Sequence, residues 1–161
     1  WDEFAIPRIA QLTQRTNQFN LTTKRYSEAE INLLAHSESS LIYYIKSGDR
    51  FGEHGIVATC IIHIKDDSWE IDTFLLSCRV IGRGIEQAFL HFICQNAIKK
   101  NIKKIIGKFL PTQKNTIAES FYPNMGFKTQ LSNKQENVFI LDLSFNLVSL
   151  PMHINKINHG L

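Results

Sequence analysis

The sequence predicts an α/β protein in which a central mixed sheet, of the α+β kind, is flanked by helices. A strand-like run at residues 69–77 passes through a glycine turn into a helix-like run at 85–100, and a second strand-like run follows at 104–109. Of the 161 residues, 43% are hydrophobic and 20% are charged, which is ordinary for a globular domain with its own core.

The first half of the chain predicts two helices and three strands. Near the start of the chain, Pro7 suits a first helical turn, and a set of mostly apolar residues repeats every three or four positions: Ile6, Ile9, Leu12, Thr16 and Phe19. Ser27 and Glu30 have capping-box spacing, so a short helix should run through Ile31 and Leu34. Residues 40–46 alternate weakly before a turn at 47–49, and the Ile- and Val-rich residues 55–65 predict a strand that turns at 66–67 into the strand beginning near Trp69.

The second half continues this order. Apolar side chains in residues 85–100 form one stripe at helical spacing: Ile85, Ala88, Phe89, Phe92, Ile93 and Ala97. After the strand at 104–109, a helix should begin at Asn115, whose side-chain oxygen suits an N-cap, and should stop at Gly126. Residues 137–145 predict the last strand, and the tail at 146–161 carries no pattern.

Residues 79–85, Arg-Val-Ile-Gly-Arg-Gly-Ile, are the most informative stretch. Two glycines at a strand-to-helix turn let a ligand approach the backbone, and the free N–H groups of the next helical turn attract phosphate oxygens. A dinucleotide fingerprint fails because Gln87 stands at its third glycine, and no P-loop pattern is present. A tight turn with two solvated arginines remains an alternative. The predicted phosphate-binding residues are Arg79, Val80, Gly82, Arg83, Gly84 and Ile85.

The pattern R-x-x-G-x-G at 79–84 resembles the coenzyme A loop of the GNAT superfamily of acyltransferases. A second GNAT-like motif, N-x-x-A-x-x-φ-Y-x-x-x-G-F with φ apolar, matches residues 115–127. The resemblance implies a GNAT acyl-CoA N-acyltransferase-like fold, coenzyme A as cofactor, contact of Asn115 with the pantetheine arm, and Tyr122 as the acid that protonates the departing thiolate. The alternative for Tyr122 is a part-buried core aromatic.

The strand before the loop offers further candidates for acyl transfer. A thioester lying along residues 70–77 would have its carbonyl held by a backbone N–H near Leu75 or Leu76. Glu70 and Asp72 share one face of that strand and are candidate bases, or else ordinary solvated charges. Cys78 is either a covalent acyl carrier, since a neighbouring arginine and helix N-terminus favour a thiolate, or a buried and inert thiol.

The first 145 residues are also similar to the C-terminal part of FkbH-like proteins, notably in residues 7–31 and 72–84. These proteins join a haloacid-dehalogenase-type domain to a GNAT-like domain and load a glyceryl unit onto an acyl carrier protein in polyketide biosynthesis. The resemblance implies a linker helix from an upstream domain at 1–26, a GNAT-like domain at 27–145 and a tail at 146–161. No D-x-D-x-T phosphatase motif occurs, so that chemistry is not carried over.

Three functions remain open: a GNAT-like domain that binds the pantetheine of coenzyme A or of an acyl carrier protein during acyl transfer, a stand-alone N-acetyltransferase, and a non-catalytic docking module. A lysine cluster at 99–104 is a solvated helix end or a patch for an acidic carrier protein. The net charge of +3, the scattered histidines and the three cysteines without metal spacing predict no nucleic acid, no metal and a reduced, cytoplasmic setting. The sequence contains no run of about 18 apolar residues, so it predicts no membrane span.

Overall fold

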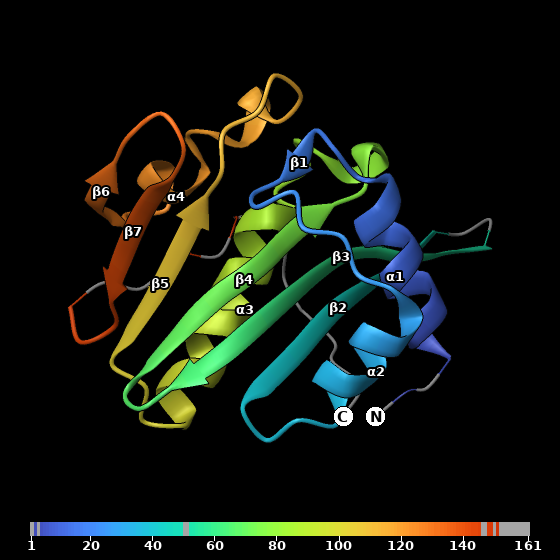
Figure 1. Ribbon diagram of the computed structural model, residues 1–161, viewed down its shortest axis with the longest axis horizontal. Helices are drawn as coiled ribbons and strands as arrows, with labels where there is room; N and C mark the ends of the chain where they lie inside the picture. Colours follow the sequence, from blue (N-terminus) through green and yellow to red (C-terminus); the bar gives the residue numbers. More distant parts are fainter. Residues whose placement is uncertain (1, 3, 50–51, 146–147, 150, 152–161) are drawn as a thin grey trace.

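The computed structural model describes all residues except 1, 3, 50–51, 146–147, 150 and 152–161 (Figure 1). In this described part, seven strands form one sheet in the order β2–β3–β4–β5–β7–β6, and the short β1 pairs with β4. The elements are α1 (Ala5–Arg15), β1 (Phe19–Asn20), α2 (Glu28–Ala35), β2 (Ser40–Asp49), β3 (Gly52–Lys65), β4 (Ser68–Leu76), the 3-10 turn η1 (Cys78–Val80), α3 (Ile85–Lys99), β5 (Lys104–Phe109), the 3-10 turn η2 (Thr116–Ala118), α4 (Phe121–Asn124), β6 (Lys128–Ser132) and β7 (Asn137–Asp142).

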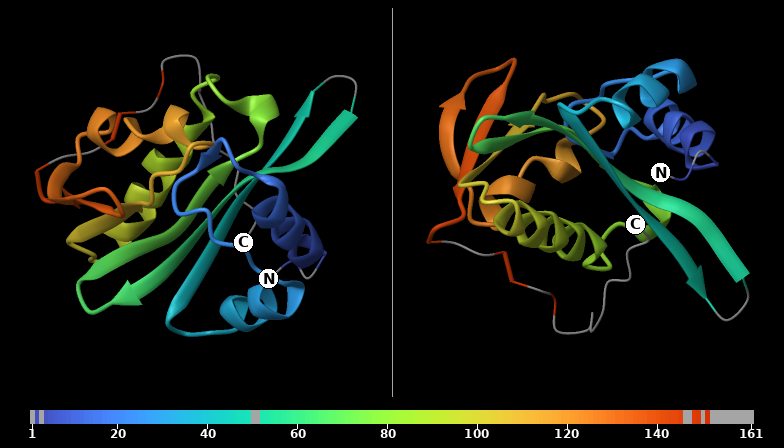
Figure 2. Two further views of the ribbon diagram at one scale, coloured as in Figure 1. Left: turned by 45° about the horizontal axis from the view of Figure 1, so that its top comes forward. Right: turned by 90° about the horizontal axis from the view of Figure 1, so that it is seen from below.

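Helices cover both faces of the sheet. Helices α1 and α2 lie on one face, and α3 and α4 lie on the other (Figure 2). Each face has its own core, and the side of α3 and α4 holds most of the aromatic rings. Alternate residues of β4 serve the two cores, since Phe74 belongs to the α3 side and Leu75 to the α1 side. The predicted mixed sheet flanked by helices is confirmed.

Local sequence signals account for most elements. The capping box of α2 is present, with the Ser27 hydroxyl accepting from the Glu30 N–H and the Glu30 carboxylate accepting from the Ser27 N–H. The helix α1 ends at Arg15, before the predicted limit at Phe19, because the chain becomes extended at Thr16. The last strand likewise ends at Asp142 rather than at residue 145.

The segment after β5 departs most from the prediction. In place of one helix from Asn115 to Gly126, the chain forms the short turn η2 and the four-residue helix α4. Gly126 does follow the helix end, with the left-handed φ of +86° that glycine tolerates. Strand β6 was not predicted because all five of its residues are exposed and give no apolar alternation.

Strands β4 and β5 are parallel and pair over only part of their length. Their register runs from Ser68 opposite Lys104 to Ile71 opposite Gly107. A bulge follows at once, because β3 pairs Ile62 with Ile71 and Ile61 with Thr73, which leaves Asp72 unopposed. Beyond this point the two strands diverge, and β1 lies at the end where they have separated (Figure 1).

Candidate functional site

The loop between β4 and α3 has the geometry of an anion cradle. Gly82 and Gly84 have left-handed φ values of +77° and +76°, and Gly84 is the N-cap of α3. Val80 is buried and anchors the turn, whereas Arg79 and Arg83 are exposed beside it. The first turn of α3, whose N–H groups lack partners within the helix, thus lies beside two exposed arginines, and phosphate binding there stays a prediction.

Charge near this loop is not uniformly positive. Glu86 lies in the first turn of α3, and its Oε2 is buried without a hydrogen-bond partner among the described residues. That carboxylate opposes the two arginines. On the α1 side of the loop, a cavity of about 190 Å³ adds positive charge, because Arg8 and Arg15 line it with Arg79. The loop region thus carries basic side chains toward α1 and one acidic side chain, Glu86, at the start of α3.

The edge of β4 just before the cradle is occupied by another segment of the chain, β1. Phe19 pairs with Leu76 and Asn20 with Leu75, in antiparallel register. The expected carbonyl-binding N–H near Leu75 or Leu76 therefore lies on an edge that already carries β1. Its use by a ligand stays a prediction, and it requires β1 to leave.

Asn115 uses its whole side chain within the protein. Its Nδ2 donates to the carbonyl oxygens of Asn20 (3.0 Å) and Leu110 (3.0 Å), and its Oδ1 accepts from the N–H (2.8 Å) and hydroxyl (3.0 Å) of Thr112. The predicted N-cap bond is wrong, since no side-chain cap bond forms at η2. An amide has two donor hydrogens and one acceptor oxygen, so contact with a pantetheine arm would need one of these bonds to break.

Tyr122 is enclosed beneath strand β5. Its side chain is 1% exposed, and its hydroxyl has no hydrogen-bond partner among the described residues. The ring lies against Gly107, where a Cβ would come within 2.4 Å of the ring carbon Cζ. Burial, with a smaller effect of the Cys60 thiol, raises the pKa of Tyr122 well above its usual value. An unpartnered buried phenol is what a proton donor awaiting a ligand would look like, but here the hydroxyl is closed off from solvent.

Asp72 is buried in a polar network and is no solvated charge. Lys24 and Tyr26 both donate to its carboxylate, the Thr73 hydroxyl donates at 3.0 Å, and His63 Nε2 lies 3.4 Å away. Burial raises the pKa of Asp72, but the hydrogen bonds from Lys24 and Tyr26 and the Lys24 charge outweigh it, so the net pKa is lowered. These contacts hold the residues after β1 against β4.

The second acid of the strand, Glu70, is tied to β5. Its Oε1 accepts from the Lys108 ammonium at 3.0 Å, and both side chains are partly exposed. Glu70 and Asp72 lie on the face of the sheet opposite Trp69 and Ile71, which belong to the core on the α3 side. Their role as base stays a prediction, and in this arrangement both serve as ion-pair partners between neighbouring segments.

The three cysteines separate by exposure. Cys78 is exposed, so the buried alternative considered for it is wrong, whereas Cys60 and Cys94 are buried. Burial raises the pKa of Cys60 well above its usual value and that of Cys94 to about 12. Cys78 lies in η1 beside the cradle and lines the basic cavity with Arg79. It is the exposed one of the three thiols, and a covalent role for it stays a prediction.

The residues fit coenzyme A in part. The cradle at 79–85 suits the phosphate end in composition, because first-turn N–H groups that lack a partner within the helix lie beside left-handed glycines and exposed arginines. The pantetheine arm does not fit along β4 in this arrangement, because β1 occupies the strand edge and Asn115 is engaged.

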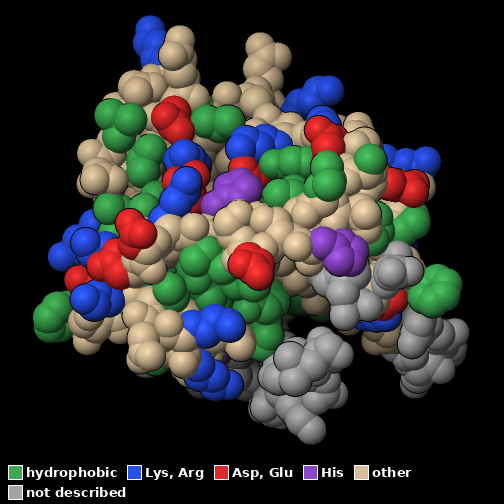
Figure 3. Space-filling model, turned by 60° about the horizontal axis from the view of Figure 1, so that its bottom comes forward, with side chains coloured by type: hydrophobic (Ala, Val, Ile, Leu, Met, Phe, Trp, Pro, Cys, Tyr) green, Lys and Arg blue, Asp and Glu red, His purple; other side chains and the backbone are tan. Residues whose placement is uncertain are grey.

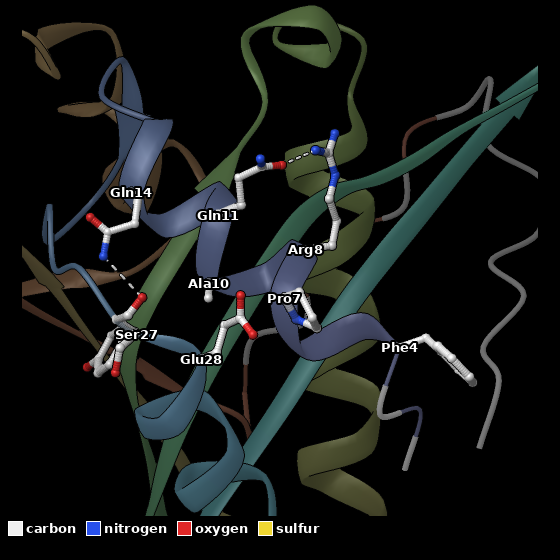
Figure 4. Close-up of a pocket in the computed structure, with 9 residues that line it drawn as sticks. Phe4, Pro7, Arg8, Ala10, Gln11, Gln14, Ser27 and Glu28 are labelled. Carbon is white, nitrogen blue, oxygen red and sulfur yellow. Dashed lines mark hydrogen bonds between the residues drawn. The ribbon is translucent and has the colours of Figure 1, made fainter.

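Other surfaces carry none of the predicted site residues. A groove of about 480 Å³ lies between α1 and α2, where Gln14 donates to the Tyr26 carbonyl oxygen and Arg8 to Gln11 (Figure 4). On the face drawn in Figure 3, basic and acidic side chains are interleaved. Among the described residues no group of three or more His, Cys, Asp or Glu is placed to hold a metal, and no described helix is long and apolar enough to span a membrane.

Comparison with known proteins identifies the fold. The ribosomal-protein-S18-alanine N-acetyltransferase of Escherichia coli matches 99% of this chain and 96% of its own, with a TM-score of 0.67 and 13% identity. The chain has a GNAT-like fold. Rv2747 of Mycobacterium tuberculosis, solved with CoA, matches at a TM-score of 0.64 and 14% identity over 87% and 95% of the two chains.

Further comparisons agree at the level of the fold. Mutant forms of the spermidine/spermine N-acetyltransferase SpeG of Vibrio cholerae match at a TM-score of 0.64 and 14% identity, over 89% and 91% of the two chains. No protein-family model matches the sequence, and no curated protein matches it either. None of these structures is an FkbH-like protein, so that finer resemblance stays a proposal.

Several residues that shape this part of the structure were missed at the sequence level. Gly107 was not singled out, although a glycine inside a strand indicates close approach of another group. Asp72 is bound to the segment after β1 by Thr22, Lys24 and Tyr26. These contacts span about 50 residues of sequence, so no local pattern predicts them. The polar residues 22–25 were the available signal, since polar residues between two helices need partners when they are buried.

Proposed function

We propose that this chain is a GNAT-like domain of an FkbH-like biosynthetic protein that grips the phosphate end of coenzyme A or of a carrier protein's phosphopantetheine. The acyl or glyceryl unit would be handled in concert with an upstream haloacid-dehalogenase-type domain, in the cytoplasm. The observation that carries this proposal is the cradle, where two left-handed glycines and two exposed arginines precede the N-terminus of a 15-residue helix.

Docking is favoured over chemistry by the surroundings of the predicted catalytic groups. Tyr122 is closed off, Asp72 is locked by Lys24 and Tyr26, and the edge of β4 carries β1. A domain that only holds a phosphorylated arm needs none of these groups to be free. The non-catalytic docking module is therefore the form of the proposal that these contacts support best.

The lysine cluster is a second contact for the same partner. Lys99, Lys100, Lys103 and Lys104 are all exposed at the C-terminal end of α3. At 1.5 Å per residue, the 15 residues of α3 separate this patch from the cradle by about 22 Å. The two basic sites would thus contact different parts of an acidic carrier protein. The cradle would bind the phosphate of its phosphopantetheine, and the lysine patch would bind its folded surface.

A stand-alone N-acetyltransferase is the second candidate. It is supported by the N-acetyltransferase that matches 99% of the chain in fold, and by the Tyr122 hydroxyl, which has no hydrogen-bond partner among the described residues. Tyr122→Phe separates the two candidates, because it removes a proton donor without removing the ring. Loss of most acetyl transfer to a polyamine or peptide amine, with unchanged binding, would establish the enzyme; no transfer by the wild type would exclude it.

Calorimetric titration with coenzyme A and with a holo carrier protein tests the docking proposal. Arg83→Glu reverses a charge beside the phosphates, so affinity should fall by about tenfold or more. Lys134→Glu is the matched control, because Lys134 is exposed in the turn between β6 and β7 and has the same charge change. Equal affinity of the Arg83 and Lys134 variants would overturn the cradle assignment.

A further inference from the structure

Residues 19–22, which we call the strap, fill the opening between the diverging strands β4 and β5. On one side the Leu21 N–H donates to the Phe74 carbonyl oxygen of β4 at 3.1 Å. On the other side the Leu110 N–H, just after β5, donates to the Leu21 carbonyl oxygen at 2.8 Å. A single residue thus bridges the two strands at the level where they no longer pair with each other.

The strap is built into the core and is not laid over it. Phe19 is 4% exposed and Leu21 is fully buried. The Phe19 ring packs edge-on against Phe121 at 5.4 Å and is tilted against Phe74 at 6.4 Å, measured between ring centroids. Removing these side chains from their places would expose two large apolar groups, which strongly favours the seated position.

Polar contacts fix the strap at both ends. The Thr22 hydroxyl donates to the Asp72 carbonyl oxygen at 2.8 Å, and Lys24 and Tyr26 donate to the Asp72 carboxylate just beyond. At the other end Asn20 donates through Nδ2 to the Thr16 carbonyl oxygen at 3.2 Å, and Asn115 donates to the Asn20 carbonyl oxygen at 3.0 Å. The bulge at Asp72 and the side chain of Asn115 therefore both serve to hold the strap.

A ligand arm leaving the cradle meets the strap at once. The cradle follows directly on Leu76, and the neighbouring backbone edge, from Leu76 to Phe74, is paired with residues 19–21. We propose that the strap takes the place of a pantetheine arm, so that the seated chain binds ligands by their phosphate end alone and admits the arm only when the strap leaves. This inference rests on the proposed phosphate cradle and adds that the pantetheine arm is excluded from the edge of β4 next to it.

Two probes separate the phosphate end from the arm: coenzyme A, and 3′-phospho-ADP, its nucleotide part without pantetheine. With the strap seated, the wild type should bind both with dissociation constants within about threefold, because the arm gains no contact. In Thr22→Val/Lys24→Met, which loosens the strap from Asp72, coenzyme A should bind about tenfold tighter while 3′-phospho-ADP is unchanged. Thr129→Val/Lys134→Met, on exposed positions of β6 and the following turn, is the matched control and should behave as the wild type.

Amide hydrogen exchange of the wild-type protein measures directly whether the strap is in place, without any variant. The Leu21 N–H donates from the strap to β4, and the Leu110 N–H donates to the strap, so the exchange protection of these two amides measures how firmly the strap is held in place. Saturating coenzyme A should leave both protected in the wild type. The inference about the strap is wrong if coenzyme A binds the wild type more than tenfold tighter than 3′-phospho-ADP does. It is also wrong if coenzyme A removes the exchange protection of both amides. Either result leaves the cradle assignment intact. Failure of both probes to bind any form overturns the cradle itself.

Discussion

Gly107 offers a direct test of how Tyr122 is held, because the ring of Tyr122 lies where a Cβ would be. In Gly107→Ala the new carbon would stand 2.4 Å from Cζ, 2.5 Å from Cε1 and 2.8 Å from Cε2 of that ring. Ordinary contact begins at 3.4 Å, so the ring must move by about 1 Å. It is packed against Phe121, Phe127 and Phe139 at centroid distances of 5.4, 4.9 and 5.5 Å and has little room to do so.

The expected cost follows from overpacking. Such insertions cost about 1–3 kcal/mol, and the entropy gained by replacing a strand glycine returns less than about 1 kcal/mol. The free energy of unfolding should therefore fall by about 2 kcal/mol, measured by urea unfolding followed by circular dichroism. In a Tyr122→Leu background, which removes the ring, the same substitution should cost less than half as much. If Gly107→Ala unfolds at the same urea concentration as the wild type, the Tyr122 ring does not lie as close to β5 as described.

Two further predictions concern Asp72 and the thiols. Asp72→Asn should lower the free energy of unfolding by about 1–3 kcal/mol at neutral pH, because the buried carboxylate loses the charge that Lys24 and Tyr26 solvate. Since the folded pKa lies below the reference value of 3.8, this difference should be constant above about pH 5 and shrink as the pH falls through the folded pKa, and a constant difference down to pH 2 in urea melts would contradict it. Ellman's reagent should modify Cys78 at once in the native protein, and Cys60 and Cys94 only in denaturant; rapid modification of all three would refute their burial.

The sequence was enough to predict most strands of the sheet, the helices α1, α2 and α3 and the glycine turn before α3, because these rest on local patterns. The apolar stripe of α3, the capping box of α2 and the two glycines before Ile85 each act within a few residues of one another. Side chains of this kind report their own secondary structure through spacing alone. The two motifs at 79–84 and 115–127 then placed the loop and the Tyr122 helix in the right order.

Long-range contacts were beyond those patterns. The strap contains only the two-residue strand β1, and its partners come from β4 and from the segment after β5. Asn115 looked like a helix cap because that is the usual local role of asparagine, but three of its four bonds go to the loop before it and the fourth to Asn20. Asp72 looked like a surface acid because its neighbours in sequence say nothing of Lys24.

The strap also sets an order of events for folding. Its bonds join residues separated by 50 positions, from Thr22 to Asp72, and by 95 positions, from Asn20 to Asn115. Loops of that length close late, after hairpins such as β2–β3 have formed from near neighbours. On a ribosome, residues 19–22 must wait until the chain has been made past residue 115, with Phe19 and Leu21 lacking their final partners throughout. The strap is therefore secured among the last parts of the fold, and its docking between β4 and β5 should be the slow phase of refolding.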